Sequence, residues 1–208
     1  MTIILFIVAY LIGSFPTALI VGRLAFNIDI REHGSNNPGA TNTLRVLGKK
    51  AAIIVLLIDV GKGALAANLP VLLGLEIDSL LIGLAAVFGH CFPIFAGFRG
   101  GKAIATTAGV LIAANIWMFF AAYLAFFLVI YISKYVYYGS ISVGLALLIY
   151  SFFTPNREDE LIFSIFLLFL IYLHRSNIHN HFHKREPKIN DKSLKDDRIP
   201  PKNNAKRA

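Results

Sequence analysis

Three short polar segments interrupt an otherwise apolar chain, and each carries residues that could bind a negatively charged group. They are R-E-H-G-S-N-N-P-G-A-T-N-T-L-R at 31–45, F-R-G-G-K at 98–102 and H-R-S-N at 174–177. Glycine and asparagine tolerate tight turns and positive φ angles, so such a backbone can turn successive N–H groups toward one anion. The same composition also occurs in ordinary loops between helices. A shared anion site requires that the three segments lie on one side of a membrane.

The first segment offers the largest number of hydrogen-bond donors. Ser35, Thr41 and Thr43 add hydroxyl groups to the backbone N–H groups. Arg31 and Arg45 flank the segment with positive charge. Charge-assisted hydrogen bonds from arginine are among the strongest contacts to phosphate oxygens. The segment therefore predicts a site for an anion.

The second segment follows an apolar run that ends in aromatic residues. We expect the chain to turn at Gly100 and Gly101 and a helix to begin near Lys102. Helix N-termini attract anions through unpaired N–H groups and the helix dipole. A lysine in the first turn opposes that dipole, so we expect Lys102 to face a bound anion. A Walker A loop is excluded, because the G-x-x-x-x-G-K-[ST] spacing is absent.

The third segment places His174 and Asn177 three residues apart at the end of the last apolar run. Three further histidines alternate just beyond it and could bind a metal adventitiously: His179, His181 and His183. Nothing else in the sequence completes a designed metal site. Cys91 is the only cysteine, which excludes an intramolecular disulfide and a cysteine metal cluster. We therefore predict no metal and no cofactor.

Ionisable residues also occur inside the apolar runs, where they are costly and are either functional or mutually paired. Asp59 and Lys62 stand three apart on one helical face. A structural ion pair within a helix bundle is one interpretation of these two residues, and a functional role is the other. His90 has the same two interpretations, since it could simply pack and hydrogen-bond between helices.

The bulk composition identifies an integral membrane protein. The 208 residues are 56% hydrophobic and 15% charged, with a mean hydropathy of +0.65. A soluble domain carries about 25% charged residues. The first apolar run has no basic region before it and no A-x-A-like cleavage site, so it is expected to be a retained span.

A helix needs about 20 apolar residues to cross a bilayer. The sequence predicts seven transmembrane helices, at 2–24, 51–75, 80–98, 103–114, 117–133, 135–153 and 161–173. The first is interrupted by G-S-F-P at 13–16, where Pro16 would break the helix and Ser14 could satisfy a freed backbone group. The fourth and seventh are short. A re-entrant pair in place of the fourth and fifth spans is the main alternative.

The distribution of charge predicts the orientation, since basic loops stay cytoplasmic. Ten of the 20 lysine and arginine residues lie from Arg175 onward, and the formal net charge is +8. Placing the N-terminus outside and the C-terminus in the cytoplasm leaves Arg157 as the only basic residue of the outer segments, in the T-P-N-R-E-D-E loop. All three polar segments then face the cytoplasm. The polar tail at 181–208 has no apolar period and is predicted to be disordered.

Three motifs, in their order along the chain, resemble those of the bacterial acyl-phosphate:glycerol-3-phosphate acyltransferase family. They are G-S-F-P at 13–16, G-S-N-N-P-G-A-T-N at 34–42 and G-H-C-F-P-I-F-A-G-F-R-G-G-K-A-I-A-T at 89–106. The resemblance covers residues 1–180, which are then a polytopic membrane acyltransferase domain, with 181–208 as a basic cytoplasmic tail. Two departures are Tyr137-Tyr138-Gly139 before Ser140, where the family usually has serines, and a longer basic tail.

The resemblance implies the first acylation of phospholipid synthesis at the cytoplasmic face of the bacterial inner membrane. A fatty acyl phosphate gives its acyl group to the 1-hydroxyl of glycerol 3-phosphate, which forms lysophosphatidic acid and releases phosphate. The lipid bilayer is the other partner, and no nucleic acid is implied. The residues expected to take part in catalysis are Ser35, Lys102, His174 and Asn177. The residues expected to bind substrate are Asn37, Gly39, Ala40, Thr41, Asn42, Arg45, Gly100, Gly101 and Ser140.

Within that site, Arg45 and Lys102 are expected to clamp the phosphate of glycerol 3-phosphate, while His174 and Asn177 orient its glycerol part. Ser35 and the N–H groups at 36–41 would hold the acyl phosphate head and the developing oxyanion. No residue stands out as a nucleophile, so a substrate phosphate is the expected base. Other acyltransferases use an H-x-x-x-x-D pair, which this sequence lacks.

Two alternatives from the sequence remain open. An organic-anion transporter or channel would use the same cations, but it would need polar groups through the depth of the membrane. Acyl-carrier protein or acyl-CoA could also replace acyl phosphate as the donor, because a basic surface suits an acidic carrier.

Overall fold

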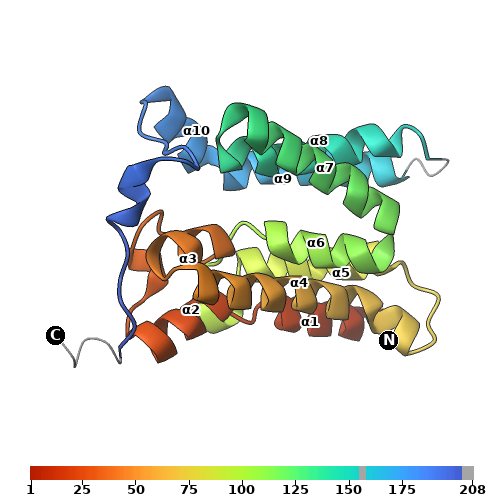
Figure 1. The fold of residues 1–208 in the computed structure, drawn as a ribbon. Helices are drawn as coiled ribbons and strands as arrows, with labels where there is room; N and C mark the ends of the chain where they lie inside the picture. The colour runs from red at the N-terminus through yellow and green to blue at the C-terminus, as the bar shows by residue number, and fades with distance from the viewer. Residues whose placement is uncertain (155–157, 203–208) are drawn as a thin grey trace. The chain divides into compact units, whose positions relative to one another are not determined.

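The computed structural model describes residues 1–154 and 158–202, which form helices joined by turns and contain no strand (Figure 1). This confirms the all-helical class. The chain divides into two compact units, Met1–Ala114 with Ser193–Ala208, and Asn115–Lys192. Arg157 and its neighbours 155 and 156, in the predicted outer loop, lie outside the described residues, as do residues 203–208.

The long helices of the first unit follow the predicted apolar runs. They are α1 (Thr2–Gly13), α4 (Lys49–Leu72), α5 (Ser79–Cys91) and α6 (Ile104–Ala114). The shorter elements between them are α2 (Thr17–Val21), a π-helix (Gly22–Phe26), 3-10 turns at Ile30–Glu32 and Ile94–Ala96, and α3 (Ala40–Val46).

The first apolar run is broken at G-S-F-P, as predicted. Helix α1 ends at Gly13 and α2 begins at Thr17, with Pro16 as its N-cap. Within the described part of the chain, the Ser14 hydroxyl has no hydrogen-bond partner. The carbonyl of Phe15 instead accepts a hydrogen bond from Lys62 Nζ at 2.9 Å. A lysine from another helix therefore takes the role that we had expected for Ser14.

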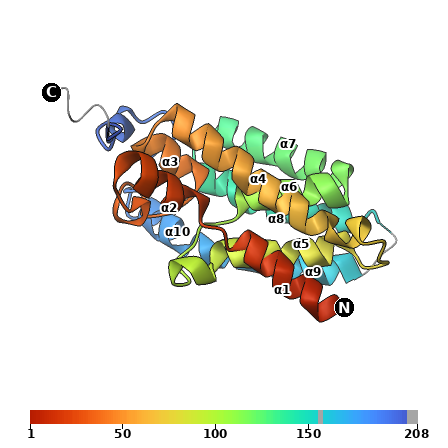
Figure 2. The ribbon, with the colours of Figure 1, turned by 90° about the horizontal axis from the view of Figure 1, so that it is seen from below.

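Helix α4 lies at the centre of the first unit and packs against α1, α5 and α6 (Figures 1 and 2). The contact with α6 is close enough to need glycine, because a Cβ at Gly109 would lie 1.9 Å from the carbonyl oxygen of Val60. The inner face of α4 carries small residues and the ionisable pair: Ala51, Ala52, Val55, Asp59, Lys62, Gly63, Ala66, Ala67 and Pro70. Its exposed face carries Ile53, Ile54, Leu56, Leu57, Ile58 and Leu65. Small residues at helix contacts and large apolar residues outside are typical of membrane helices.

The second unit consists of α7 (Ile116–Ser133), α8 (Val136–Ser151), α9 (Glu158–Leu173) and α10 (Arg175–Phe182). Helix α8 packs against both α7 and α9. The side chain of Asn115 caps α7 by accepting the N–H groups of Trp117 and Met118 at 2.9 and 3.2 Å. Helices α7, α8 and α9 match the last three predicted apolar runs closely.

Among residues 1–154 and 158–202, four stretches are long and apolar enough to cross a membrane: Thr2–Phe26, Lys49–Leu72, Ser79–Ala96 and Ile116–Ser133. The pair Asp159–Leu173 and Arg175–Phe182, bent by 53°, would make a fifth if it forms one broken span. Ile104–Ala114 and Val136–Ser151 are shorter apolar helices. The prediction of seven spans and of their orientation stays a prediction.

The tail beyond residue 180 was expected to lack structure. In the part that the structure describes, α10 continues to Phe182, and a 3-10 turn covers Lys192–Lys195. Further along, the N–H of Ile199 donates to the Val46 carbonyl at 2.8 Å. The Ile199 side chain packs against a buried cluster that includes Val46 and Leu47. Ile199 is a single apolar residue in a polar stretch, so the spacing of apolar residues in the sequence did not predict its contact with the cluster.

Candidate active site

The first polar segment is a loop held together by Asn42, in the first turn of α3. The side-chain oxygen of Asn42 accepts the N–H of Ser35 at 2.9 Å, and its nitrogen donates to the carbonyls of Ile30 and His33 at 3.3 and 3.0 Å. Asn42 is only 1% exposed, whereas Ser35 is exposed. Asn42 is thus an internal brace that presents Ser35 at the surface of the loop.

Part of the expected nest of N–H groups is used within the loop itself. The N–H groups of Asn36 and Gly39 donate to carbonyls two or three residues earlier, at 3.1 and 2.9 Å. The half-buried Asn37 side chain lies against Gly39. Helix α3 begins at Ala40 without a side-chain cap. The N–H groups of Ala40 and Thr41, in the first turn of α3, have no carbonyl partner within the helix.

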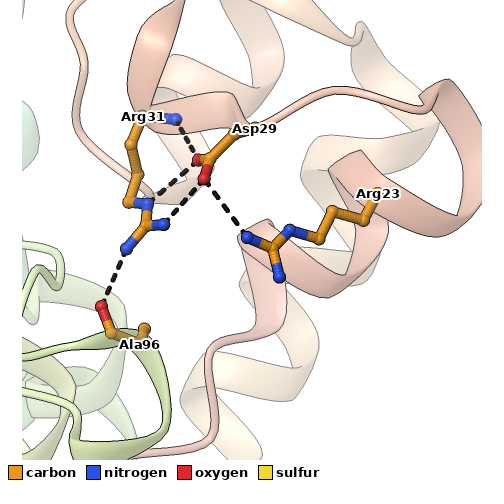
Figure 3. Close-up of polar contacts among 4 residues, drawn as sticks. All are labelled: Arg23, Asp29, Arg31 and Ala96. Atoms are coloured by element: carbon orange, nitrogen blue, oxygen red, sulfur yellow. Dashed lines mark hydrogen bonds and ion pairs between the residues drawn. The ribbon is translucent and has the colours of Figure 1, made fainter.

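Arg31 ties the first polar segment to the 3-10 turn that comes just before the second (Figure 3). Its guanidinium donates to both carboxylate oxygens of Asp29, at 2.9 and 2.7 Å, and to the carbonyl of Ala96 at 2.8 Å. These side-chain hydrogen bonds lower the pKa of Asp29 from 3.8 to about 2. Arg23 lies at the edge of the cluster, 3.5 Å from Asp29. We had expected Arg31 to be a flanking cation, but its geometry makes it a clamp between two loops.

The glycine segment folds back onto the end of α5. The N–H groups of Gly100 and Gly101 donate to the carbonyls of Cys91 and His90, at 3.2 and 3.1 Å. A Cβ at Gly101 would lie 2.2 Å from Nε2 of His90. Only glycine leaves room for the imidazole at this position. His90 therefore fixes the shape of the turn that precedes Lys102.

Lys102 lies before the next helix rather than in its first turn. Helix α6 begins at Ile104, and Ala103 has a positive φ of 56°. Phe98, on the other side of the two glycines, has a φ of 58°. Left-handed conformations are unfavourable for such side chains and are typical of functional loops. A helix begins near Lys102, as predicted, but Lys102 precedes its first turn, because Ala103 leaves the helical region.

A buried polar network lies next to this turn and joins four helices. Asp59 Oδ1 accepts from Lys62 Nζ and from the Thr17 hydroxyl, both at 2.9 Å. Nδ1 of His90 lies 3.7 Å from the same oxygen and 3.1 Å from the Thr106 hydroxyl. Asp59 is 1% exposed and Lys62 is 7% exposed. The expected pair between Asp59 and Lys62 therefore exists, and His90 extends it toward the glycine segment.

A small cavity of about 10 Å³ opens where the network meets the two loops. Its lining includes Arg31, Lys62, His90, Gly100 and Gly101. A volume of this size holds roughly one water molecule, so the cavity is too small for a substrate in this structure. It does bring the glycines of the second segment together with Arg31 of the first.

Arg45 lies in the last turn of α3, and its Nε pairs with the carboxylate of Asp197 from the tail. The two side chains are 24% and 33% exposed. The sequence reasoning missed this partner, since 152 residues separate the two and no local pattern links them. The only indication in the sequence is that Asp197 is an acidic residue within a mostly basic tail.

His174, Asn177 and Ser140 belong to the second unit. Nδ1 of the buried His174 donates to the carbonyl of Leu170 at 2.8 Å. In the neutral ring this bond leaves Nε2 as the accepting nitrogen. Asn177 donates to a Glu186 carboxylate oxygen at 2.6 Å, and the Ser140 hydroxyl donates to the Val136 carbonyl at 3.1 Å.

The structure thus groups the predicted residues in two sets. Ser35, Arg45 and Lys102 belong to the first unit, and His174 and Asn177 to the second. Within the first unit, the clamp from Arg31 to Ala96 joins the loops that carry Ser35 and Lys102. Among the described residues, no group of three or more His, Cys, Asp or Glu could hold a metal ion.

Comparisons with known proteins connect these residues to a family. A family model described as glycerol-3-phosphate acyltransferase matches residues 3–184. A glycerol-3-phosphate acyltransferase of Bacillus subtilis is 48% identical over 186 residues, which cover 89% of this chain and 96% of the relative. Glycerol-3-phosphate acyltransferase 2 of Bacillus cereus is 47% identical over 189 residues, which cover 91% and 96%.

Solved structures agree with the sequence comparisons. A crystal structure of PlsY (YgiH), an integral membrane glycerol 3-phosphate acyltransferase, in its glycerol 3-phosphate form, has a TM-score of 0.82 and 33% identity. That match covers 92% of this chain and 96% of the other. The lysophosphatidic acid form has a TM-score of 0.78 at the same identity. The chain therefore belongs to the glycerol-3-phosphate acyltransferase family of integral membrane enzymes.

Proposed function

We propose that this chain transfers a fatty acyl group from acyl phosphate to the 1-hydroxyl of glycerol 3-phosphate, forming lysophosphatidic acid for phospholipid synthesis. The observation that carries the proposal is the family match over residues 3–184, which contains every residue assigned to the site. The related crystal structures are of a glycerol 3-phosphate form and a lysophosphatidic acid form, which correspond to the acceptor and the product.

The proposed topology has seven spans in the bacterial inner membrane, with the N-terminus outside and the site on the cytoplasmic face. The supporting observation is the asymmetry of charge, since basic segments are retained in the cytoplasm. The boundary of the enzyme domain at residue 180, with a basic tail beyond it, belongs to the same proposal. Both substrates are anionic and one carries a long apolar chain, so a basic mouth beside the bilayer suits them.

In the proposed mechanism, Arg45 and Lys102 bind the phosphate of glycerol 3-phosphate, with Gly100 and Gly101 allowing a close approach to the backbone. His174 and Asn177 orient the glycerol. Nε2 of His174 is the acceptor for a glycerol hydroxyl, because Nδ1 donates to Leu170. The Ser140 hydroxyl is a further contact to the acceptor.

The donor is held by the first polar segment. Ser35 and the N–H groups of Ala40 and Thr41 bind the acyl phosphate head and the oxyanion that develops on its carbonyl. Gly39 and Asn37 shape this end of the loop, and Asn42 acts by holding Ser35 in place. Fixed donors aimed at a developing oxyanion contribute about 2.7–4 kcal/mol each in known enzymes.

The chemical step needs no protein nucleophile. The 1-hydroxyl oxygen attacks the carbonyl carbon, and the bond from that carbon to the phosphate oxygen breaks. Inorganic phosphate leaves, and the hydroxyl proton passes to a phosphate oxygen. Positioning and electrostatic stabilisation are sufficient for a donor that is already activated.

The function is tested by supplying purified protein in lipid with glycerol 3-phosphate and one of three donors: palmitoyl phosphate, palmitoyl-CoA or palmitoyl-carrier protein. We expect lysophosphatidic acid from palmitoyl phosphate alone. Product only from CoA or carrier protein would overturn the donor assignment and keep the acceptor. Absence of product with all three would lead to anion-flux measurements and the transporter alternative.

The phosphate clamp is tested by Lys102→Ala, with the exposed Lys50→Ala as a matched control. We expect Lys102→Ala to lower turnover about 10²- to 10³-fold, as loss of one fixed hydrogen-bond donor does in other enzymes. Lys50→Ala should retain wild-type turnover, and thermal unfolding should show that both variants are folded. Near-normal turnover by Lys102→Ala would remove Lys102 from the mechanism.

A further inference from the structure

The described part of the C-terminal tail lies along the ends of α3 and of the π-helix Gly22–Phe26, and hydrogen bonds attach it to both. The N–H of Ile199 donates to the Val46 carbonyl at 2.8 Å, and the N–H of Lys202 donates to the Ala25 carbonyl at 3.1 Å. The Arg198 guanidinium donates to the Leu44 carbonyl at 3.3 Å. Helix C-termini leave carbonyl groups without partners inside the helix. The tail therefore satisfies groups that α3 cannot satisfy itself.

This docking places the Asp197 carboxylate on Arg45. Asp197 lies two residues before Ile199, whose side chain packs against the first unit's buried cluster and whose backbone is bonded to Val46. An anchor so close in the chain gives the carboxylate a high effective concentration at the arginine. The pair is an interaction within the first unit.

The tail also lies outside the region shared with the family. The family model ends at residue 184, and the tail segment that reaches Arg45 begins after residue 192. Asp197 therefore lies beyond the part of the chain that the family model matches.

We propose that Asp197 is an affinity-determining residue of the acceptor site: an internal anion that competes with the phosphate of glycerol 3-phosphate for Arg45. This inference rests on the proposed role of Arg45 in binding that phosphate. A carboxylate and a phosphate oxygen make the same charge-assisted bonds to a guanidinium. Both side chains of the pair are partly exposed, and such pairs are weak. A phosphate dianion can therefore displace Asp197, so the tail weakens acceptor binding without blocking the reaction.

The test compares full-length Asp197→Asn with Asp196→Asn, which removes the same charge one residue away. At saturating palmitoyl phosphate, we expect Asp197→Asn to lower KM for glycerol 3-phosphate about two- to fivefold, the range of a weak ion pair, with kcat unchanged. Asp196→Asn should match wild type. Equal KM values in the two variants, or a raised KM in Asp197→Asn, would overturn the inference.

A second variant and a second readout keep the inference separate from the proposed function. Deleting residues 193–208 removes the whole docked segment and should lower KM as Asp197→Asn does. If wild type fails to turn over palmitoyl phosphate, the proposed donor is wrong, but binding of glycerol 3-phosphate can still be measured by calorimetry. Tighter binding by Asp197→Asn than by Asp196→Asn would then support the competition. Equal binding, or none, would reject it.

Discussion

Two clusters of the first unit pair a carboxylate with at least one cation, and their surroundings differ sharply. Asp59 lies among Lys62, Thr17 and His90 at the centre of the helices, with its side chain 2% exposed. Asp29 lies between Arg31 and Arg23 beyond the end of the first apolar stretch, with its side chain 16% exposed. The first cluster is a buried network, and the second is a clamp at the surface.

The difference shows that an ion pair affects stability differently when it is buried and when it is near the surface. A buried ion pair gains little net stability, but removing one partner leaves an uncompensated charge. The Asp59 cluster is therefore intolerant of single changes. In the Asp29 cluster the carboxylate orients the Arg31 guanidinium, which also donates to the Ala96 carbonyl. Its energy comes from charge-assisted hydrogen bonds that water partly replaces.

The largest expected effect is that of Lys62→Met, which leaves Asp59 buried without its cation. We expect a loss of about 3–5 kcal/mol in the free energy of unfolding. The measurement is thermal or denaturant unfolding in detergent, with the exposed Lys50→Met on the same helix as control. The comparison between the two clusters would be broken if Lys62→Met were no more destabilising than a change in the clamp.

The clamp is tested by Arg31→Gln. Loss of its charged hydrogen bonds should cost about 1.5–3 kcal/mol, and turnover should fall because the glycine segment loses its link to the first loop. The control is Arg23→Gln, since Arg23 is exposed and only 3.5 Å from Asp29. That variant should lie within about 0.5 kcal/mol of wild type. Equal effects at the two positions would mean that the bond to Ala96 is unimportant.

The double variant Asp59→Leu/Lys62→Met sharpens the contrast. Replacing a whole buried pair by apolar residues is often neutral, so we expect stability within about 1 kcal/mol of wild type. A double variant as unstable as Lys62→Met alone would show that Thr17 and Phe15, which are bonded to the pair, dominate its energetics.

The smallest effect is the acid response of the clamp. The folded pKa of Asp29 is about 2, below its ordinary value of 3.8. A lowered carboxyl pKa adds stability that is complete above the ordinary value and is lost as pH falls toward the folded value. The stability difference between wild type and Asp29→Asn should therefore be constant above a pH of about 5 and shrink between about 4 and 2. A difference that grows on acidification would contradict the bond pattern.

The long helices of this fold could be predicted from the sequence because each is an apolar run bounded by a turn signal. The short helices α3 and α10 lie in polar stretches and were not predicted. The break at Pro16 and the pair of Asp59 with Lys62 followed from local rules as well. The contacts that organise the site did not. Arg31 reaches a carbonyl 65 residues away, and Arg45 a carboxylate 152 residues away. Local periodicity carries no information about such distant partners. Every residue also has a backbone carbonyl, so the residue type does not indicate which carbonyl accepts the bond.

The break in the first span also has a consequence for how the chain is made. The Phe15 carbonyl, beyond the end of α1, accepts from the nearby Thr17 N–H at 3.1 Å and from Lys62, which is synthesised 47 residues later. Lys62 in turn enters an apolar environment with Asp59, three residues before it, as its neutralising partner. The second of these two hydrogen bonds can therefore form only after α4 has been made and lies beside the first segment. The two segments are thus complementary in sequence: the break in the first exposes a carbonyl oxygen, and α4 carries the ammonium group that donates to it.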